Sequence, residues 1–333
     1  MPTALVTGAA GFIGYHLCAR LLSEGWRVVG IDALTDYYDP ELKRARLALL
    51  KARPDFEIIE ARIEEEGRLL SLMQTHQPEL VVHLAAQAGV RHSIDAPRSY
   101  MHANLEGTFE LLEAARAVPP RHMLLASTSS VYGANTKIPY AETDRADHPL
   151  SFYAATKKAM EAMAHSYAHL YDLPMTMFRF FTVYGPWGRP DMALFKFTRG
   201  ILEGLPIDIY NHGQMRRDFT YIDDLIEGVI RLSSTVPGQG AVVTGDSLSS
   251  VAPFRVVNVG NGAPVQLLDF VTAIETALDQ SADRNMMEMQ PGDVLETWAD
   301  TSLLRQLVGE LPKTQLAEGV GEFVRWYRGY YGT

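Results

Sequence analysis

Tyr153 and Lys157 lie four residues apart in the stretch SFYAATKKAME, which follows Pro149. Side chains at this spacing share one face of a helix, so the phenol and the ammonium group can meet. A free tyrosine titrates near about 10, too high for a base at neutral pH, but a nearby positive charge favours the phenolate. The spacing therefore predicts a tuned acid/base. A solvated lysine beside a half-buried tyrosine is the simpler alternative.

A second set of residues points to a dinucleotide. The stretch TGAAGFIG places Gly8, Gly11 and Gly14 where a strand-like run meets a helical one. Residues without a Cβ let the backbone approach a pyrophosphate, and a helix N-terminus favours its negative charge. Asp32 ends the next strand-like run, 18 residues after Gly14, where a carboxylate binds ribose hydroxyls and repels a 2′-phosphate. This order of residues predicts NAD rather than NADP as the cofactor.

The first half of the chain has the pattern of a scaffold that could position these residues. Apolar strand-like runs alternate with helical periodicity, at TALVTG, RVVGID, FEIIEARI, LVVHLAA, HMLLAST and PMTMFRFF. Such alternation indicates an α/β fold with a Rossmann-type, doubly wound parallel sheet that helices cover on both faces. Ligands of these sheets bind at the carboxyl ends of the strands. We therefore expect the glycine turn and the YxxxK helix to meet there.

After residue 180 the alternation becomes irregular, and proline and glycine gather in VYGPWGRPDM. We expect an NAD-binding Rossmann domain from residues 1–181 plus about 216–260. A smaller C-terminal lobe, from about 182–215 plus 261–333, is expected to bind the substrate. The stretch 234–254 is rich in Ser, Gly, Thr and Val, which is typical of a loop.

Bulk properties exclude several classes of function. The chain of 333 residues carries a formal net charge of −10 and no basic run, which argues against a nucleic-acid partner. No apolar run reaches the ~18 residues of a membrane helix. The single cysteine, Cys18, allows no internal disulfide, and the N-terminus runs straight into a strand pattern. We expect a cytoplasmic protein, and the ten histidines show no metal-ligand spacing, so no metal is expected.

The motifs GxxGxxG, HLAAQ, STSSVYG and YxxxK occur in this order, and with them the chain resembles the extended short-chain dehydrogenase/reductases, specifically the nucleotide-sugar epimerases. The segments 180–193, FFTVYGPWGRPDMA, and 213–224, GQMRRDFTYIDD, resemble most the members that epimerise UDP-glucuronate. The resemblance covers nearly the whole chain. It implies NAD as the cofactor, a UDP-sugar as the substrate and a homodimer that includes the YxxxK helix.

The resemblance also implies roles for individual residues. Tyr153 would be the catalytic acid/base, Lys157 would bridge the nicotinamide ribose and lower the pKa of that tyrosine, and Thr128 would assist at the sugar hydroxyl. The cofactor would be bound by these two residues of the YxxxK pair together with Gly8, Gly11, Phe12, Ile13, Gly14, Asp32, Ile63, Ala85, Ala86, Gln87 and Asn104. Many relatives have an Asp at the third place of EARI, where this chain has Arg62, which could stack on the adenine or face solvent.

On the substrate side, the resemblance implies contacts to the sugar, the diphosphate and the uridine. The matching residues are Ser127, Thr128, Ser129, Thr182, Arg189, Tyr210, Arg217 and Asp293. Arg217 would bind the diphosphate, Asp293 of QPGDV would bind the uridine ribose, and Tyr210 is either near the uracil or a core aromatic. Relatives specific for UDP-galactose have an Arg where this chain has Gln290, so less positive charge is expected there.

The residues after Thr128 favour epimerisation over other reactions of the family. Similar dehydratases carry Asp-Glu at these two places and decarboxylases carry Glu at the second, whereas this chain has Ser129 and Ser130. With no carboxyl group to relay a proton, oxidation and re-reduction at C4 remain. We expect NAD-dependent conversion of UDP-glucuronate to UDP-galacturonate through a 4-keto intermediate.

Arg189 of GPWGRP is our candidate for binding the glucuronate carboxylate, because a guanidinium fork suits bidentate contact. A structural arginine in a Pro/Gly-rich loop is the alternative. The open rivals for the whole chain are a UDP-glucose or UDP-N-acetylglucosamine 4-epimerase, a UDP-glucuronate decarboxylase, and a non-catalytic NAD-sensing protein. Tyr37, Tyr38 and Trp187 either border the site or belong to the core of the smaller lobe, and we favour the core.

Overall fold

Seven parallel strands form the central sheet of the computed structural model, which describes residues 1–240, 242–290 and 292–333. Ala241 of the 234–254 stretch and Pro291 of the QPGDV motif thus lie outside the described residues. The strands of this sheet are β1 (Thr3–Thr7), β2 (Arg27–Asp32), β3 (Phe56–Glu60), β4 (Leu80–His83), β5 (His122–Thr128), β6 (Met175–Phe180) and β10 (Phe254–Val259).

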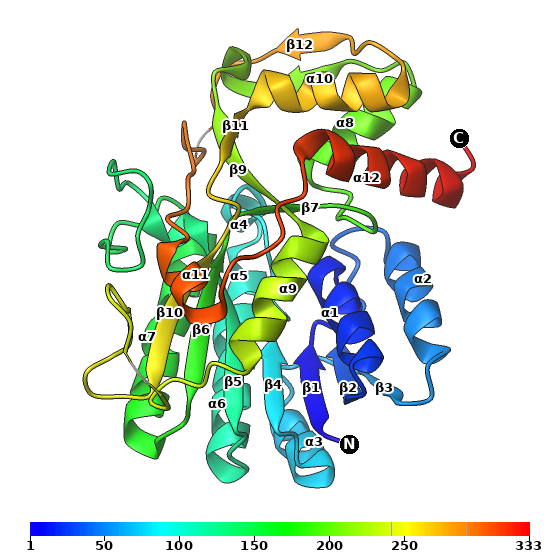
Figure 1. Cartoon of the computed structure of the whole chain (residues 1–333). Helices are drawn as coiled ribbons and strands as arrows, with labels where there is room; N and C mark the ends of the chain where they lie inside the picture. Colours follow the sequence, from blue (N-terminus) through cyan, green and yellow to red (C-terminus); the bar gives the residue numbers. More distant parts are fainter. Residues whose placement is uncertain (241, 291) are drawn as a thin grey trace.

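The strand order, β10-β6-β5-β4-β1-β2-β3, confirms the predicted doubly wound fold. From β1 the chain adds β2 and β3 on one side, then returns to place β4 on the other side of β1. All pairings are parallel, as expected for strands joined by helices (Figure 1). The reversal between β1 and β4 is the switch point, where two adjacent connections leave in opposite directions and open a crevice.

Helices cover both faces of this sheet and bury two separate apolar clusters. One face carries α3 (Arg68–His76), α6 (Gly107–Ala117) and α7 (Phe152–Tyr171). The other carries α1 (Phe12–Ser23), α2 (Pro40–Lys51), α9 (Ile222–Ser233) and α11 (Ser302–Val308). Successive strand residues point to opposite faces, so Leu5 joins the first cluster while Ala4 and Val6 join the second.

A smaller part lies at the carboxyl ends of the sheet strands (Figure 1). It contains the sheets β11-β9-β7 and β12-β8. Their strands are β7 (Thr182–Tyr184), β8 (Ile207–Ile209), β9 (Arg216–Tyr221), β11 (Pro264–Gln266) and β12 (Arg284–Met286). The helices of this part are α8 (Ala193–Leu202), α10 (Leu267–Leu278) and α12 (Leu316–Tyr331).

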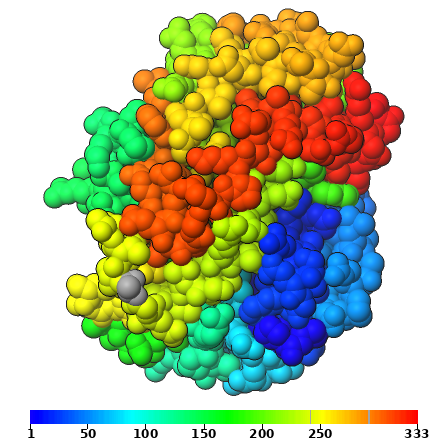
Figure 2. Space-filling model, viewed as in Figure 1, coloured from blue at the N-terminus to red at the C-terminus, as the bar shows by residue number. Residues whose placement is uncertain are grey.

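The placement of two elements differs from the expected division of the chain. The sequence assigned 216–260 to the dinucleotide domain, but β9 pairs with β7 and β11 in the small sheet, and only α9 and β10 lie with the large sheet. Conversely, α11 packs against β10 although it belongs to the C-terminal range. In Figure 2 the yellow-green residues of α9 lie between the orange segment that contains α11 and the dark blue N-terminal residues, in agreement with the contacts of α9 with both α1 and α11.

Short helices connect these elements near the crevice. They are α4 (His92–Asp95), α5 (Pro97–Tyr100), the π-helix η1 (Met101–Glu106), and the 3-10 helices η2 (Ser129–Tyr132) and η3 (Tyr210–Gly213). α7 begins behind the cap residue Ser151, whose hydroxyl accepts a hydrogen bond from the Ala154 amide at 3.1 Å. This cap fixes where the helix starts and therefore where Tyr153 stands. No helix in the described part of the chain has the length and apolar character needed to cross a membrane.

Candidate active site

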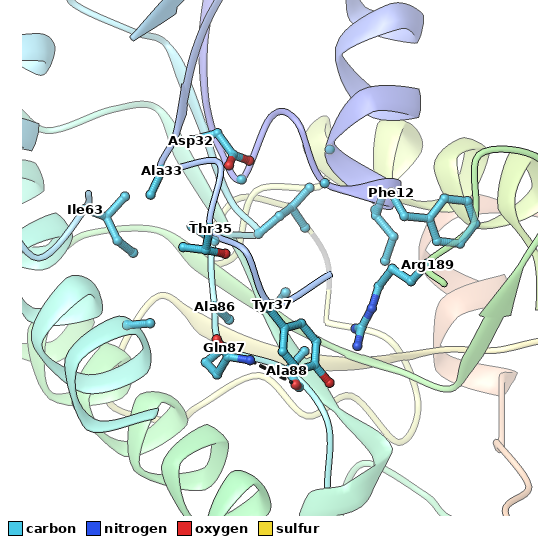
Figure 3. Close-up of a pocket in the computed structure, with 18 of the residues that line it drawn as sticks. Phe12, Asp32, Ala33, Thr35, Tyr37, Ile63, Ala86, Gln87, Ala88 and Arg189 are labelled. Carbon is cyan, nitrogen blue, oxygen red and sulfur yellow. Dashed lines mark hydrogen bonds between the residues drawn. The ribbon is translucent and has the colours of Figure 1, made fainter. Parts of the chain in front are cut away.

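A cavity of about 690 Å³ opens at the carboxyl ends of the central strands and contains most of the predicted site residues. Those that line it are Gly8, Gly11, Phe12, Ile13, Gly14, Asp32, Ile63, Ala85, Ala86, Gln87, Ser127, Thr128, Tyr153, Lys157 and Arg189. The cavity wall does not include Asn104, Ser129, Thr182, Tyr210, Arg217 or Asp293. Figure 3 shows the side of the cavity that runs from Asp32 to Gln87 and Arg189.

The glycine turn between β1 and α1 leaves no room for side chains. Gly8 has a φ of +73°, and a Cβ on it would stand 2.7 Å from the Ala85 amide nitrogen. A Cβ on Gly14 would stand 2.0 Å from the carbonyl oxygen of Gly8. Gly11 caps α1 without a side-chain hydrogen bond to the first amides of the helix. Backbone donors and the helix dipole therefore face the cavity, and the turn fits a pyrophosphate.

Asp32 is 9% exposed at the end of β2 and is held by two backbone donors. Its Oδ2 accepts from the Ala10 amide and its Oδ1 from the Leu34 amide, each at 2.9 Å. Each carboxylate oxygen can accept a second hydrogen bond, which fits the two hydroxyls of an adenosine ribose. The donor set of this end of the cavity therefore fits NAD.

Asn104 does not line the cavity but contacts the backbone of Gln87, which does. This side chain, fully buried in η1, accepts from the Gln87 amide at 2.8 Å and donates to the Gln87 carbonyl at 3.1 Å. It also donates to the Thr156 hydroxyl at 3.0 Å. These three hydrogen bonds fix the loop that carries Ala85, Ala86 and Gln87, so the structure makes Asn104 a positioning residue.

Arg62 faces solvent at the rim near Ile63. Its side chain is 61% exposed and its Nη1 pairs with Glu64 at 3.1 Å. Arg62, Ile63 and Glu64 all line the cavity, and of these Ile63 is the buried one, at 5% exposure. Arg62 is therefore exposed to solvent and paired with Glu64, and it also borders the cavity. Whether it stacks on the adenine stays a prediction.

Tyr153 and Lys157 face the cavity from the first turns of α7. The ammonium of Lys157 donates to the Ala126 carbonyl at 2.8 Å, at the end of β5. Burial lowers the pKa of Lys157 to about 7, against the opposing effect of the Glu161 carboxylate. A lysine that titrates so low carries only a fractional charge at neutral pH, and this differs from the full cation that the spacing suggested.

The electrostatics of Tyr153 also differ from the expectation. Burial raises the pKa of its phenol above the ordinary value, while the Thr128 hydroxyl and the positive charge of Arg189 lower it. The cation that acts most directly on Tyr153 in this structure is therefore Arg189, which the sequence placed at the sugar carboxylate. Distance along the chain could not reveal this, because Arg189 follows Tyr153 by 36 residues.

Behind Tyr153, a buried carboxylate joins α7 to the end of β5 and to β6. Glu161, 4% exposed, accepts from the Ser127 hydroxyl at 2.6 Å and from two nitrogens of Arg179 at 2.9 and 2.8 Å. Ser127 therefore lines the cavity and donates its hydroxyl hydrogen to Glu161, which leaves its oxygen able to accept a hydrogen bond. Burial raises the pKa of Glu161, but Arg179, Lys158 and Ser127 hold it below its ordinary value.

Arg189 lines the cavity with its fork already bound. Its Nε and Nη2 contact the two carboxylate oxygens of Asp191 at 3.0 and 2.5 Å. Tyr37 donates its hydroxyl to the same carboxylate at 3.1 Å, and the guanidinium lies 5.8 Å from the ring of Tyr37 (Figure 3). Burial raises the pKa of Asp191, but Arg189 and Tyr37 hold it below its ordinary value. The bidentate geometry suits a carboxylate, and here that carboxylate is Asp191.

Five predicted substrate residues lie outside the wall of this cavity. Ser129 begins η2 directly after Thr128, and Thr182 begins β7. Tyr210, Arg217 and Asp293 gather elsewhere, with an arginine that the sequence analysis did not select. Arg91 pairs with Asp293 at 2.9 Å, and its Cζ lies 4.4 Å from the centre of the Tyr210 ring.

Several residues of the site were missed because their roles depend on tertiary contacts. Tyr37 and Tyr38, assigned to the core from sequence, line the cavity, whereas Trp187 packs against Trp326. Lys43 also lines the cavity, and its ammonium donates to the Thr35 carbonyl at 2.7 Å. A positively charged residue is expected in the wall of an anion-binding site. The sequence did not select Lys43 because helical periodicity in residues 40–51 does not show which side chains face the cavity. Among the described residues, no group of three or more metal-ligating side chains is arranged to hold a metal ion.

Comparison with known proteins agrees with this site. Residues 4–245 match the model of the NAD dependent epimerase/dehydratase family. A probable UDP-glucuronate 4-epimerase of Rhizobium meliloti is 54% identical over 327 residues, which are 97% of this chain and 96% of that protein. UDP-glucuronate 4-epimerase 3 of Arabidopsis thaliana is 48% identical and covers 99% of this chain, which spans 77% of the plant protein.

A solved structure extends the likeness to three dimensions. UDP-glucuronic acid 4-epimerase of Bacillus cereus, in complex with UDP-glucuronic acid and NAD, superposes with a TM-score of 0.87. It is 34% identical in sequence, and the match covers 99% of this chain and 100% of that chain. The likeness therefore spans both the central sheet and the smaller part.

Proposed function

The chain belongs to the NAD-dependent epimerase/dehydratase family, and from this premise we propose that it converts UDP-glucuronate to UDP-galacturonate by epimerisation at C4. The observation that carries the proposal is a single cavity that joins the dinucleotide end at Asp32 to the acid/base Tyr153. Ser129 and Ser130 stand beside Thr128 where dehydration would need carboxyl groups.

The residues that would hold NAD are the glycine turn, Asp32 and the loop from Ala85 to Gln87. When bound, NAD supplies a reversible acceptor for the hydrogen on C4 of the sugar. Lys157 would donate to the nicotinamide ribose, and the Asn104 hydrogen bonds would keep the 85–87 loop in register. No net oxidation results, so the cofactor should stay with the protein through turnover.

Tyr153 takes the proton from O4 when C4 is oxidised and returns it when C4 is reduced from the opposite face. Thr128 lies beside the phenol, and its hydroxyl lowers the pKa of Tyr153, which favours the proton-accepting form. Between the two half-reactions the 4-keto sugar must turn over within the cavity. The UDP portion must therefore be bound firmly by residues outside the cavity, while the sugar pocket stays permissive.

Arg189 is proposed to recognise the C6 carboxylate. Its charge stands in the cavity, and Asp191 with Tyr37 fixes its orientation. The 4-keto form of glucuronate is a β-keto acid, which loses CO₂ when the carboxylate bond aligns with the ketone. A fixed cation that holds the carboxylate out of this alignment would suppress that loss, as Ser129 and Ser130 offer no help to decarboxylation.

The remaining substrate residues are proposed to bind the UDP portion. Arg217 would contact the diphosphate, Asp293 the ribose and Tyr210 the uracil, and these three side chains lie around Arg91. Ser127, Ser129 and Thr182 would contact the sugar. We also propose that the large sheet with its helices acts as the NAD domain and the smaller part as the substrate lobe.

A homodimer and a cytoplasmic location are further parts of the proposal. Phe109 on α6 and Leu170 and Tyr171 on α7 are exposed, and the two helices pack side by side on one face. A second copy could bury these apolar side chains in a four-helix interface. Met160 of α7 is fully buried in the core and takes no part in this exposed face. The free thiol of Cys18 is buried and suits a reducing compartment.

The test is to incubate the purified protein with UDP-glucuronate and no added cofactor, then separate the nucleotide sugars. We expect UDP-galacturonate to appear, UDP-pentose to be a trace product at most, and UDP-glucose to turn over far more slowly. UDP-pentose as the main product would identify a decarboxylase. Tight NAD binding with no turnover of any UDP-sugar would contradict the proposal and favour a sensing role.

A further inference from the structure

Arg217 is a partly buried cation whose known contacts are not acidic. Its Nη1 donates to the main-chain carbonyls of Arg216 at 3.0 Å and Leu295 at 3.2 Å. Within the described residues, no carboxylate lies within ion-pair distance of its guanidinium. Burial lowers the pKa of Arg217, the charges of Asp293 and Tyr140 oppose this, and the positive charge of Arg91 adds to it. A buried cation that no acid neutralises indicates a site for an external anion.

Arg91 brings a second guanidinium to the same place from a different part of the fold. It follows β4, directly before α4, whereas Arg217 lies in β9 of the small sheet. Its side chain is 44% exposed and its Nη2 contacts Asp293, which is 19% exposed, at 2.9 Å. The loops are in close contact here, since a Cβ on Gly292 would stand 3.1 Å from Val90. Two cations and one carboxylate leave this cluster with a net positive charge.

The present contacts of Arg91 coincide with the proposed uridine contacts. The Cζ of Arg91 lies 4.4 Å from the centre of the Tyr210 ring, and the guanidinium is bound to the carboxylate proposed for the ribose. Such an exposed ion pair with one short contact contributes little free energy and is easily exchanged. A diphosphate offers the same guanidinium stronger, doubly charged acceptors.

We propose that Arg91 is a substrate-binding residue that exchanges Asp293 for the diphosphate of the nucleotide sugar, opposite Arg217. The exchange frees Asp293 for the ribose hydroxyls and the face of Tyr210 for the base. It also supplies the positive charge that Gln290 does not provide in this chain. The inference rests on the proposed function, because it takes a UDP-sugar as the ligand.

Two possible roles of Arg91 predict opposite changes in nucleotide affinity when its charge is removed. If Arg91 only closed the site by occupying Tyr210 and Asp293, it would compete with the nucleotide, and its removal would tighten binding. If it binds the diphosphate, its removal weakens binding and reduces the dependence of binding on salt, because one phosphate–cation contact is lost.

The test measures the Kd of UDP for the NAD-loaded protein by calorimetry, with Arg91→Gln as the variant. We expect the Kd of UDP to rise about tenfold or more, as for the loss of one charge-assisted contact, and the Kd of UMP to rise less. The KM for UDP-glucuronate should rise while kcat stays within about twofold, because Arg91 does not line the cavity that contains Tyr153 and acts on ground-state and transition-state binding alike.

Arg27→Gln is the matched control. Arg27 is 45% exposed and makes one ion pair, to Glu57 at 3.1 Å. It begins β2 at the amino end of the parallel sheet, whereas the Arg91 loop follows the carboxyl end of β4. It should leave the Kd of UDP unchanged. An unchanged or lower Kd of UDP in Arg91→Gln would overturn the inference. A parent protein that binds no UDP and epimerises no UDP-sugar would overturn the proposed function instead.

Discussion

Two arginine–aspartate pairs are proposed to bind opposite ends of the nucleotide sugar, the first near the sugar and the second near the uridine. They differ in the number of contacts between the two side chains, in exposure to solvent and in their position relative to the cavity. Arg189–Asp191 lies in the cavity wall, bidentate and about three-quarters shielded, with exposures of 22% and 24%. Arg91–Asp293 lies outside that wall, with one short contact and exposures of 44% and 19%. The first pair presents a fixed charge, whereas the second can exchange partners.

The difference matches the two tasks that an epimerase must combine. Chemistry at C4 needs groups that do not move, since a general base works only at hydrogen-bond distance and correct orientation. Uridine binding needs groups that admit and release a charged ligand. Around Tyr153 the supporting contacts are buried, as in the Glu161–Arg179 pair, with exposures of 4% and 3%. Around Asp293 the contacts are few and reach solvent.

The largest loss of activity should come from a change at the buried catalytic residues around Tyr153. Tyr153→Phe removes the proton acceptor, and we expect turnover of UDP-glucuronate to fall by about 10²–10⁴-fold with little change in the Kd of UDP. Product formation in single turnovers and UDP calorimetry measure the two quantities. Tyr38→Phe is the matched control in the same cavity wall and should keep most of the activity, because the Tyr38 hydroxyl contacts Arg46 at 2.8 Å. Equal activity of Tyr153→Phe and its parent would remove the acid/base from the mechanism.

Arg189→Gln tests whether the fixed cation recognises the sugar acid. The loss of a charged hydrogen-bonding partner should lower kcat/KM for UDP-glucuronate by about 10–100-fold. Slow turnover of UDP-glucose should fall less, because that sugar has no carboxylate. The ratio of the two values is the measurement, since Arg189 also lowers the pKa of Tyr153 and so affects both substrates. An unchanged ratio would leave Arg189 only its electrostatic effect on the phenol.

Lys157→Met tests how much the burial of the Lys157 ammonium group lowers the free energy of unfolding, measured as a function of pH. Burial lowers the pKa of Lys157 from 10.5 to about 7, so between these values the unfolded chain binds a proton that the folded chain does not. The stability of the parent relative to Lys157→Met should therefore rise as the pH increases from 7 towards 10.5. Urea unfolding at several pH values in this window measures the difference. A constant or falling difference would contradict a depressed pKa.

The smallest effect is expected for the exposed Arg91–Asp293 pair, and it concerns the free energy of unfolding. Asp293→Asn breaks an exposed ion pair, so the free energy of unfolding should change by less than about 1 kcal/mol. Asp191→Asn, which loses two contacts to Arg189 and one to Tyr37, should cost more. Denaturant unfolding of the two variants in parallel checks the order. A larger loss in Asp293→Asn would mean that the outer pair is structural and not poised to exchange.

Much of the fold was predictable because its signals are local. The strand-like runs became β1 to β6, and the glycine turn and the helix after it lie where the pattern indicated. The membership of β9 in the small sheet was not predictable, because its pairing with β7 and β11 depends on strands that are only three residues long. Such short strands carry no periodicity that distinguishes one sheet from another.

For the site, the sequence was sufficient to select Gly8, Asp32, Tyr153 and Lys157, because turn geometry and helical spacing are properties of neighbouring residues. It did not reveal that Asn104 stands behind the 85–87 loop or that Asp191 holds Arg189. The roles of the individual substrate residues stay predictions.

The residue types and their order along the chain therefore determined by themselves the doubly wound sheet, the dinucleotide turn and the candidate acid/base. Only the tertiary structure decided the charge state of these groups and their partners. Burial, which lowers the pKa of Lys157 and raises that of Tyr153, exists only once the strands and helices have packed. Arg91 and Asp293 are 202 positions apart, and folding alone brings their charges together.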